Sequence, residues 1–151
     1  MCFDQDALPP HLPHDIPGLR YAANPDENVA SKERITLTSA DGTEFAAFIA
    51  QPAHPNGAGI VILPDVRGLF AFYEELATRF AAAGVAALTI DYFGRTAGNE
   101  QRTGDFDYMP HVMQTKPEQV SKTCRLALIN CAKQQGQLCK RSLRSAFALG
   151  E

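Results

Sequence analysis

Three short segments of the sequence carry residue types that could take part in chemistry and follow apolar runs. Pro64–Gly68 follows an apolar run, Asp91–Arg95 follows a second apolar run, and Gly150–Glu151 follows a third. In an open parallel sheet, ligands bind beyond the carboxyl ends of the strands. If the three runs are strands of one sheet, we expect these segments to meet at one edge.

The first two segments offer specific chemical groups. The backbone N–H groups of Val66 and Arg67 are candidate oxyanion donors, and Asp65 adds a carboxylate. Arg95 is a fixed cation suited to a substrate that carries a carboxylate. Two plainer interpretations stay open. Asp65 is also suited to capping a turn or a helix, and Arg95 to pairing with Asp91 or Asp65.

Other candidate nucleophiles and bases are poorly placed. Ser39, Ser121 and Ser142 lie in no G-x-S-x-G setting, and His111 is a lone histidine that we interpret as a structural contact. Neither G-x-G-x-x-G nor G-x-x-x-x-G-K-[ST] occurs in the sequence, which argues against dinucleotide and nucleoside triphosphate binding. We expect no cofactor.

The first half of the chain predicts an antiparallel hairpin followed by a βαβ unit. Residues 34–39 alternate polar and apolar, an Asp-Gly turn follows at 40–42, and residues 44–50 form the returning strand. Residues 59–63 are a β-branched run typical of a central strand buried on both faces. A helix at 72–83 and an apolar strand at 85–90 complete the unit, so the two apolar strands should be parallel.

The second half predicts a long loop, a helix and a third parallel strand. Residues 91–116 form the loop, which exceeds ordinary connections and is therefore more typical of a functional segment. A helix should cover residues 118–135, with Val120, Cys124, Leu128 and Cys131 on one face. Residues 145–149 should form the strand. The whole order predicts an α/β three-layer sandwich with a mostly parallel sheet and an antiparallel hairpin at its N-terminal side.

Composition limits the partners and the compartment. The net charge of −3 and the pI near 5.8 give no electrostatic reason to expect nucleic acid or an anionic membrane as a partner. Residues 1–30 are rich in proline and resemble an extended arm rather than a signal peptide, and no stretch is apolar enough to span a membrane. The four cysteines show no metal-ligand spacing. We expect a cytoplasmic protein without a metal site.

The stretch LPDVRGLFAFYEELATRFAAAGVAALTIDYFGRTAG, residues 63–98, resembles the dienelactone hydrolase family of α/β-hydrolases. The later phrase FDYMPH, residues 106–111, is also similar to members of that family. The resemblance implies hydrolysis of a lactone or ester by a cysteine or serine nucleophile, helped by histidine and aspartate. It implies a domain over residues 31–151, with a small-molecule lactone or ester as the partner.

The resemblance also implies roles for individual residues. Asp65 matches the acidic residue, usually glutamate, that modulates the nucleophile, although aspartate reaches one methylene less far. Val66 matches a backbone oxyanion donor, and Arg95 matches the arginine that contacts a substrate carboxylate. In the family, the last strand leads into a G-x-C-x-G-G turn, where Gly150 would be the first glycine and the nucleophile would follow Glu151.

The resemblance therefore predicts a hydrolase fold that is incomplete at its C-terminus. We expect this chain to have negligible activity because the segments that supply the nucleophile, aspartate and histidine are missing. The alternative is a non-catalytic binding or regulatory module, or the remnant of a hydrolase gene. An uncovered strand at 145–149 would also favour self-association.

Overall fold

The computed structural model describes residues 25–102 and 106–134. The predicted strand at 145–149 lies outside these residues, as does most of the predicted arm, of which residues 25–30 form a short 3-10 helix and the start of the first strand. The elements in chain order are η1 Pro25–Asn28, β1 Val29–Thr38, β2 Glu44–Pro52, β3 Gly59–Ile62, α1 Ala71–Ala82, β4 Ala86–Ile90, α2 Gly94–Ala97, α3 Met109–Gln114 and α4 Pro117–Gln134.

The described strands form one sheet in the order β1-β2-β4-β3. Strands β1 and β2 pair antiparallel through the predicted Asp-Gly turn, and β3 pairs parallel to β4 through α1, so the predicted hairpin and βαβ unit are both confirmed. Strand β2 also pairs antiparallel with β4, which joins the two units into a single sheet.

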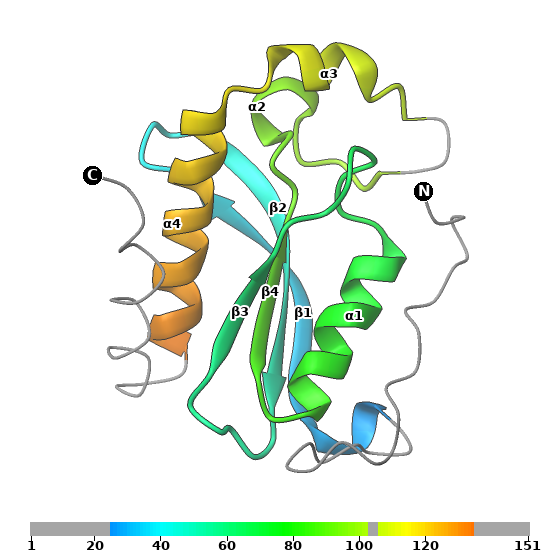
Figure 1. Cartoon of the computed structure of the whole chain (residues 1–151), viewed down its shortest axis with the longest axis vertical. Coiled ribbons are helices and arrows are strands. Elements are labelled where there is room, and N and C mark those ends of the chain that lie inside the picture. Colours follow the sequence, from blue (N-terminus) through cyan, green and yellow to red (C-terminus); the bar gives the residue numbers. More distant parts are fainter. Residues whose placement is uncertain (1–24, 103–105, 135–151) are drawn as a thin grey trace.

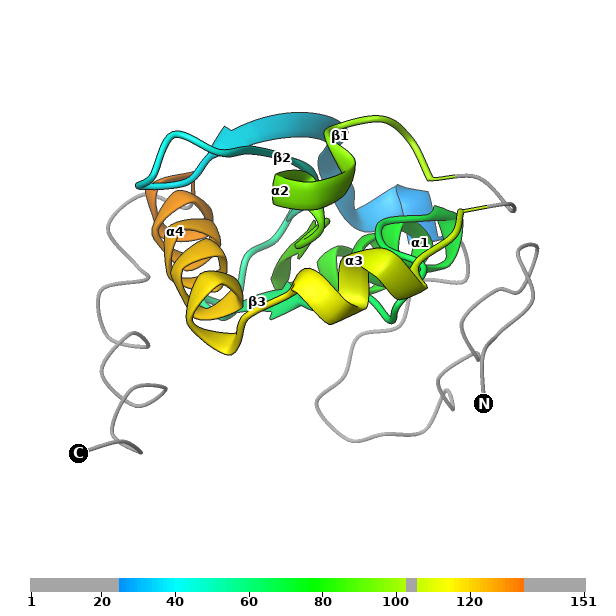
Figure 2. The same cartoon turned by 90° about the horizontal axis from the view of Figure 1, so that it is seen from above.

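Helices cover both faces of this sheet (Figures 1 and 2). The alternation of side chains along β2 explains why, since Phe48 and Ala50 pack in the cluster that contains α1, while Ala47 and Ile49 pack in the cluster that contains Ala127 of α4. The two clusters confirm the predicted three-layer α/β arrangement.

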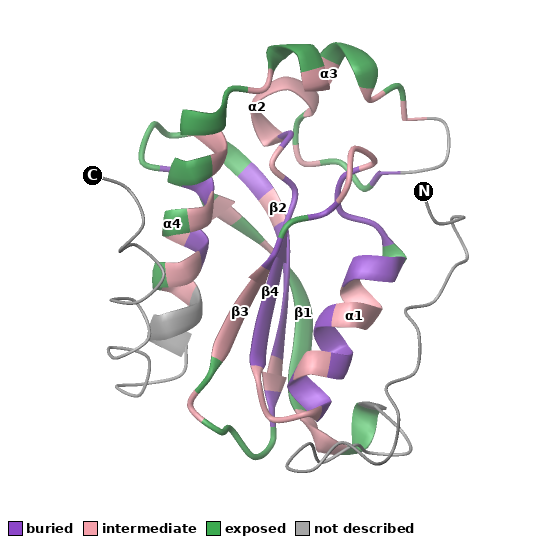
Figure 3. Ribbon diagram, viewed as in Figure 1, coloured by how far each residue is buried: buried purple, intermediate pink, exposed green. Residues whose placement is uncertain are grey.

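Burial is greatest in β4 and falls toward β3 (Figure 3). All five residues of β4 are buried, but three of the four residues of β3 are half-buried. The prediction that 59–63 is a central strand buried on both faces is therefore wrong for the described residues. The physical reason is that β3 is one of the two edge strands of the described sheet, and Leu63, which follows it, is 48% exposed.

Helix α4 agrees with the predicted helix, but its most buried positions differ from the predicted stripe. Thr123 and Ala127 are buried, whereas Cys124 and Leu128 are half-buried. Thr123 is tolerated there because its hydroxyl donates to the Gln119 carbonyl 3.0 Å away. The side chain of Cys131 lies outside the described residues.

The predicted loop at 91–116 contains two short helices, α2 and α3. They lie together beyond the carboxyl ends of β3 and β4 (Figure 1). Pro110 stands in the first turn of α3, a position that proline favours. This segment therefore forms a structured rim above the sheet edge where the chemical groups were predicted.

Candidate functional site

Two turns meet at the carboxyl ends of β3 and β4, as the sequence predicts. The turn after β3 contains Asp65, and the turn after β4 begins with Asp91 and Tyr92. The Tyr92 hydroxyl donates a hydrogen bond to the Asp65 carbonyl oxygen at 3.2 Å, which ties the two turns together. This edge is the candidate site.

The turn after β3 is held by Asp65 at its start. The Asp65 carboxylate accepts a hydrogen bond from the Arg67 N–H at 2.9 Å and pairs with the Arg67 guanidinium at 3.0 Å. The Asp65 carbonyl accepts from the Gly68 N–H at 3.0 Å, and the Asp65 N–H donates to the Tyr73 hydroxyl at 2.9 Å. Asp65 thus caps a turn, which confirms the plainer of its two interpretations without excluding the other.

Val66 lies at the tip of this turn and is half-buried. Its N–H makes no hydrogen bond to another residue in the described ranges. The neighbouring N–H of Arg67 is occupied by Asp65. Of the two candidate oxyanion donors, only Val66 therefore keeps a backbone N–H that no described group accepts.

The turn after β4 is built around a buried ion pair that sequence analysis missed. Asp91 and Arg102 are 1% and 6% exposed, and their charged atoms are 2.8 Å apart. Asp91 also accepts from the Phe93 N–H at 2.9 Å, and Arg102 donates to the carbonyls of Ala97 and Gly98. The position of Asp91 directly after an apolar strand was the one feature of the sequence that pointed to this ion pair. No helical or strand spacing links Asp91 to Arg102, so its partner could not be predicted.

Arg95 points away from Asp65 and into a different network. Its guanidinium donates to the Asp41 carboxylate at 2.7 and 3.1 Å, to the Thr123 hydroxyl at 3.0 Å and to the Ser39 hydroxyl at 3.0 Å. The hydrogen bond from Arg95, followed by that from the Thr43 backbone, holds the pKa of Asp41 well below its usual range. Arg95 thereby joins the β1–β2 turn to α4.

The interpretation that Arg95 pairs with Asp91 or Asp65 is wrong. Asp91 is taken by Arg102 and Asp65 by Arg67, so the aspartate left within reach of Arg95 is Asp41 in the hairpin turn. The predicted contact of Arg95 with a substrate carboxylate stays a prediction.

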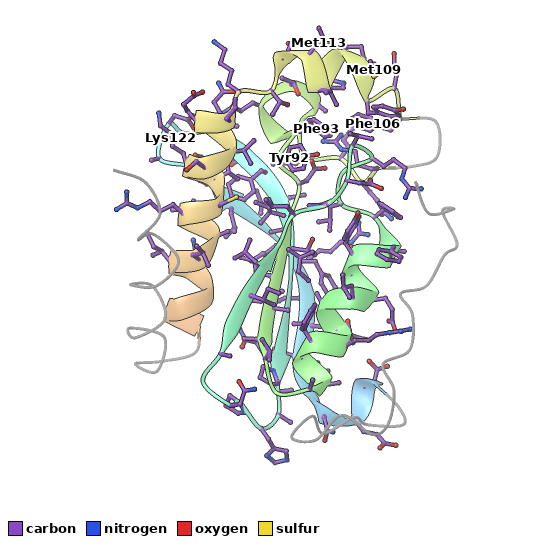
Figure 4. The ribbon with its side chains drawn as sticks, in the orientation of Figure 1. Tyr92, Phe93, Phe106, Met109, Met113 and Lys122 are labelled. Carbon is purple, nitrogen blue, oxygen red and sulfur yellow. The ribbon has the colours of Figure 1, made fainter. Side chains whose placement is uncertain are left out.

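Aromatic rings connect the candidate site to α3 (Figure 4). Tyr92 contacts Phe93 with ring centroids 4.4 Å apart, Phe93 lies 5.9 Å from Phe106, and Phe106 stacks on His111 at 5.1 Å. Burial, and then the negative charges of Asp65 and Asp91, raise the pKa of Tyr92 to about 12. The stacking of His111 agrees with its interpretation as a structural contact.

The described residues contain no group of three or more His, Cys, Asp or Glu side chains that could hold a metal ion. No helix among them is long and apolar enough to cross a membrane. Ser39 is buried against Arg95, and Cys124 is half-buried on α4, where burial raises the pKa of its thiol. Neither residue is suited to act as a nucleophile at the candidate site.

A solved structure shares the fold. A candidate dienelactone hydrolase from Klebsiella pneumoniae subsp. pneumoniae is similar, with a TM-score of 0.57 and 18% identity, over 72% of this chain and 47% of that one. The chain thus spans less than half the length of that relative. A brefeldin A esterase, described as a bacterial homologue of human hormone-sensitive lipase, gives a TM-score of 0.48 at 17% identity, over 89% of this chain and 32% of that one.

A comparison with the curated proteins finds no match. The model of the dienelactone hydrolase family, in contrast, matches residues 45–144, which include all of β2 but its first residue, β3, β4, both turns of the candidate site and α4. This chain therefore belongs to the dienelactone hydrolase family.

Proposed function

We propose that the chain serves the hydrolysis of an ester or a lactone at the carboxyl edge of β3 and β4. The observation that carries the proposal is the N–H of Val66, which stands at this edge without a described acceptor while its turn is held by Asp65. A fixed N–H donor stabilises the oxyanion that forms when a carbonyl is attacked, because it needs no reorganisation during the reaction.

Asp65 fits a supporting role in this proposal. Its carboxylate already caps the turn and pairs with Arg67, so its proposed action on a nucleophile is electrostatic and does not require it to move. Burial of the carboxylate is partial, with 27% of the side chain exposed, which leaves one side open to a neighbouring group.

We expect little turnover by the 151-residue chain on its own. No serine or cysteine among the described residues lies on either turn of the site, and a triad enzyme without its nucleophile keeps only binding and oxyanion effects. The alternative, a non-catalytic binding module, would share this lack of turnover. A cytoplasmic location, self-association and the domain boundary near residue 30 stay predictions.

The test follows the Val66 amide by nitrogen-15 NMR while ethyl butyrate is added to the purified chain. We expect the Val66 signal to shift. Val66→Pro should abolish binding because proline has no N–H, whereas the matched control Val66→Ala keeps the donor and should bind. An unmoved Val66 signal, or equal binding by both variants, would overturn the proposal.

Turnover is measured beside binding with 4-nitrophenyl acetate. We expect a rate near the uncatalysed background. A rate well above background that Asp65→Ala removes would show that the chain is an active hydrolase and that our expectation of low turnover is wrong.

A further inference from the structure

The arginines around the candidate site are already neutralised. Arg67, Arg95 and Arg102 each form an ion pair with an aspartate, at 3.0, 2.7 and 2.8 Å. A carboxylate on a substrate would have to displace one of these partners or accept a position beside it. The ion pairs differ in how firmly they are held, so each must be considered by itself.

Four of the five N–H donors of Arg95 are already occupied by side chains of the protein. Its Nε and Nη2 donate to Asp41, Nη2 donates also to Ser39, and Nη1 donates to Thr123. Only 14% of its side chain is exposed. A substrate carboxylate that took two N–H donors of Arg95 would displace at least one of the contacts that join the β1–β2 turn to α4.

Arg102 and Arg67 are restrained in the same way. Arg102 is 6% exposed and donates to Asp91 and to the Gly98 carbonyl. Arg67 is more open, but it pairs with Asp65 through two nitrogens and lies 4.3 Å over the ring of Phe70. An anion that approached Arg67 would also meet the negative charge of Asp65, which offsets the attraction.

Several large apolar side chains are exposed near this edge. Leu63, directly before the turn, is 48% exposed, and Met109 and Met113 of α3 are 54% and 79% exposed. Tyr92 and Phe106 are half-buried and lie below Met109 and Met113 in the view of Figure 4. Lys122 lies on α4, to the left of these rings in the view of Figure 4.

We propose that the substrate at this edge is a neutral ester or lactone with an apolar acyl group, rather than one that carries a carboxylate. The paired arginines and the exposed side chains of Leu63, Met109 and Met113 carry this inference, which rests on the proposed hydrolase function. Arg95 acts here as a structural clamp between the hairpin turn and α4.

The experiment compares two ligands of nearly equal size on the unmodified chain. Ethyl butyrate ends in a methyl group where monoethyl succinate carries a carboxylate. Nitrogen-15 NMR titrations follow the amides of Val66, Tyr92 and Phe106. We expect ethyl butyrate to shift these signals and monoethyl succinate to bind roughly fivefold more weakly, because it meets the aspartate charges where Arg67, Arg95 and Arg102 are already paired.

Equal or tighter binding of monoethyl succinate would overturn the inference while leaving the proposed function intact. Shifts by neither ligand would overturn the proposed function, and the inference would fall with it. The comparison uses the unmodified chain, so its outcome does not depend on the folding of a variant.

Two variants test the clamp directly. Arg95→Gln and Thr123→Val should both lower the melting temperature, because each removes contacts between α4 and the rest of the fold. Neither should change the ratio of the two dissociation constants. A loss of monoethyl succinate binding in Arg95→Gln, with no such loss in Thr123→Val, would show that Arg95 is a substrate ligand.

Discussion

The two turns of the candidate site use the same arrangement in different surroundings. Asp65 and Asp91 each follow a parallel strand, each accepts the N–H two residues later at 2.9 Å, and each pairs with an arginine. The Asp65–Arg67 side chains are 27% and 20% exposed, whereas the Asp91–Arg102 side chains are 1% and 6% exposed.

This difference in burial separates structural from chemical roles. A buried carboxylate that loses its partner is left as an uncompensated charge in a poorly solvated place, so the Asp91–Arg102 pair must stay intact for the fold to persist. When one residue of a half-exposed ion pair is lost, water solvates the other residue at little cost in free energy. The turn after β4 is therefore a support, and the turn after β3 is free to take part in chemistry.

Removal of one arginine from each pair gives the largest expected effect. Arg102→Leu should lower the free energy of unfolding by about 3–5 kcal/mol, since Asp91 stays buried without its partner. Arg67→Leu should cost about 1 kcal/mol or less, because water replaces the guanidinium. Urea unfolding measures both. Similar losses in the two variants would contradict the distinction between the turns.

Local sequence patterns predicted the strands and helices of the fold better than they predicted the side-chain contacts at the site. Hydrophobic periodicity identified the hairpin and the βαβ unit because strand and helix faces repeat at fixed spacings. The Asp41–Arg95 contact joins residues 54 positions apart and depends on where the hairpin turn meets α4, which no spacing encodes. Helix α3 was missed because six residues are too short to give a periodic signal.

Gly68 belongs to the turn after β3 and packs against the Asp91–Arg102 pair, so it tests how closely the two turns pack. Its φ of 78° is a left-handed conformation, and an added Cβ would lie 3.1 Å from both Arg102 Cγ and Asp91 Oδ2. Gly68→Ala should therefore cost at least about 2 kcal/mol, from backbone strain together with crowding against the buried pair.

Gly42 provides the matched control for this substitution. Its φ of 81° is nearly the same, but an added Cβ would have no atom within 4 Å. Gly42→Ala should cost about 1 kcal/mol from the backbone alone. Urea unfolding of the two variants separates strain from crowding. If Gly68→Ala lowers the free energy of unfolding no more than Gly42→Ala does, the Asp91–Arg102 pair can move to make room for the added Cβ.

The Tyr92 hydroxyl connects the two turns and gives a spectroscopic readout. Since burial raises its pKa from 10.0 to about 12, the fold favours the neutral form. Its contribution to stability is fully present below about pH 10 and is lost as the pH rises toward 12.

Tyr92→Phe should cost about 1 kcal/mol near neutral pH through loss of the hydrogen bond to Asp65. It should also remove the ionisation step near pH 12 from an alkaline titration in which ultraviolet absorbance follows the tyrosines; we call this the late step. A tyrosine titration that keeps this late step in the variant would mean that Tyr92 is not the buried hydroxyl between the turns.

The smallest expected effect is at Asp41, outside the two turns but joined to α4 by Arg95. The pKa of Asp41 lies below its unfolded value of 3.8 because Arg95 and Thr43 donate to the ionised carboxylate. Its stabilising contribution is therefore present above about pH 4 and is lost as the pH falls below that value.

Asp41→Asn should weaken the decline of stability in acid. It should lower stability only slightly near neutral pH, because the Asp41 side chain is 43% exposed and water screens the ion pair. Urea unfolding at several values between about pH 7 and about pH 3 measures the slope, and Asp107→Asn, at an exposed residue of the segment before α3, serves as the control. If Asp41→Asn leaves the acid slope as steep as the control does, the clamp between the hairpin turn and α4 does not depend on this ion pair.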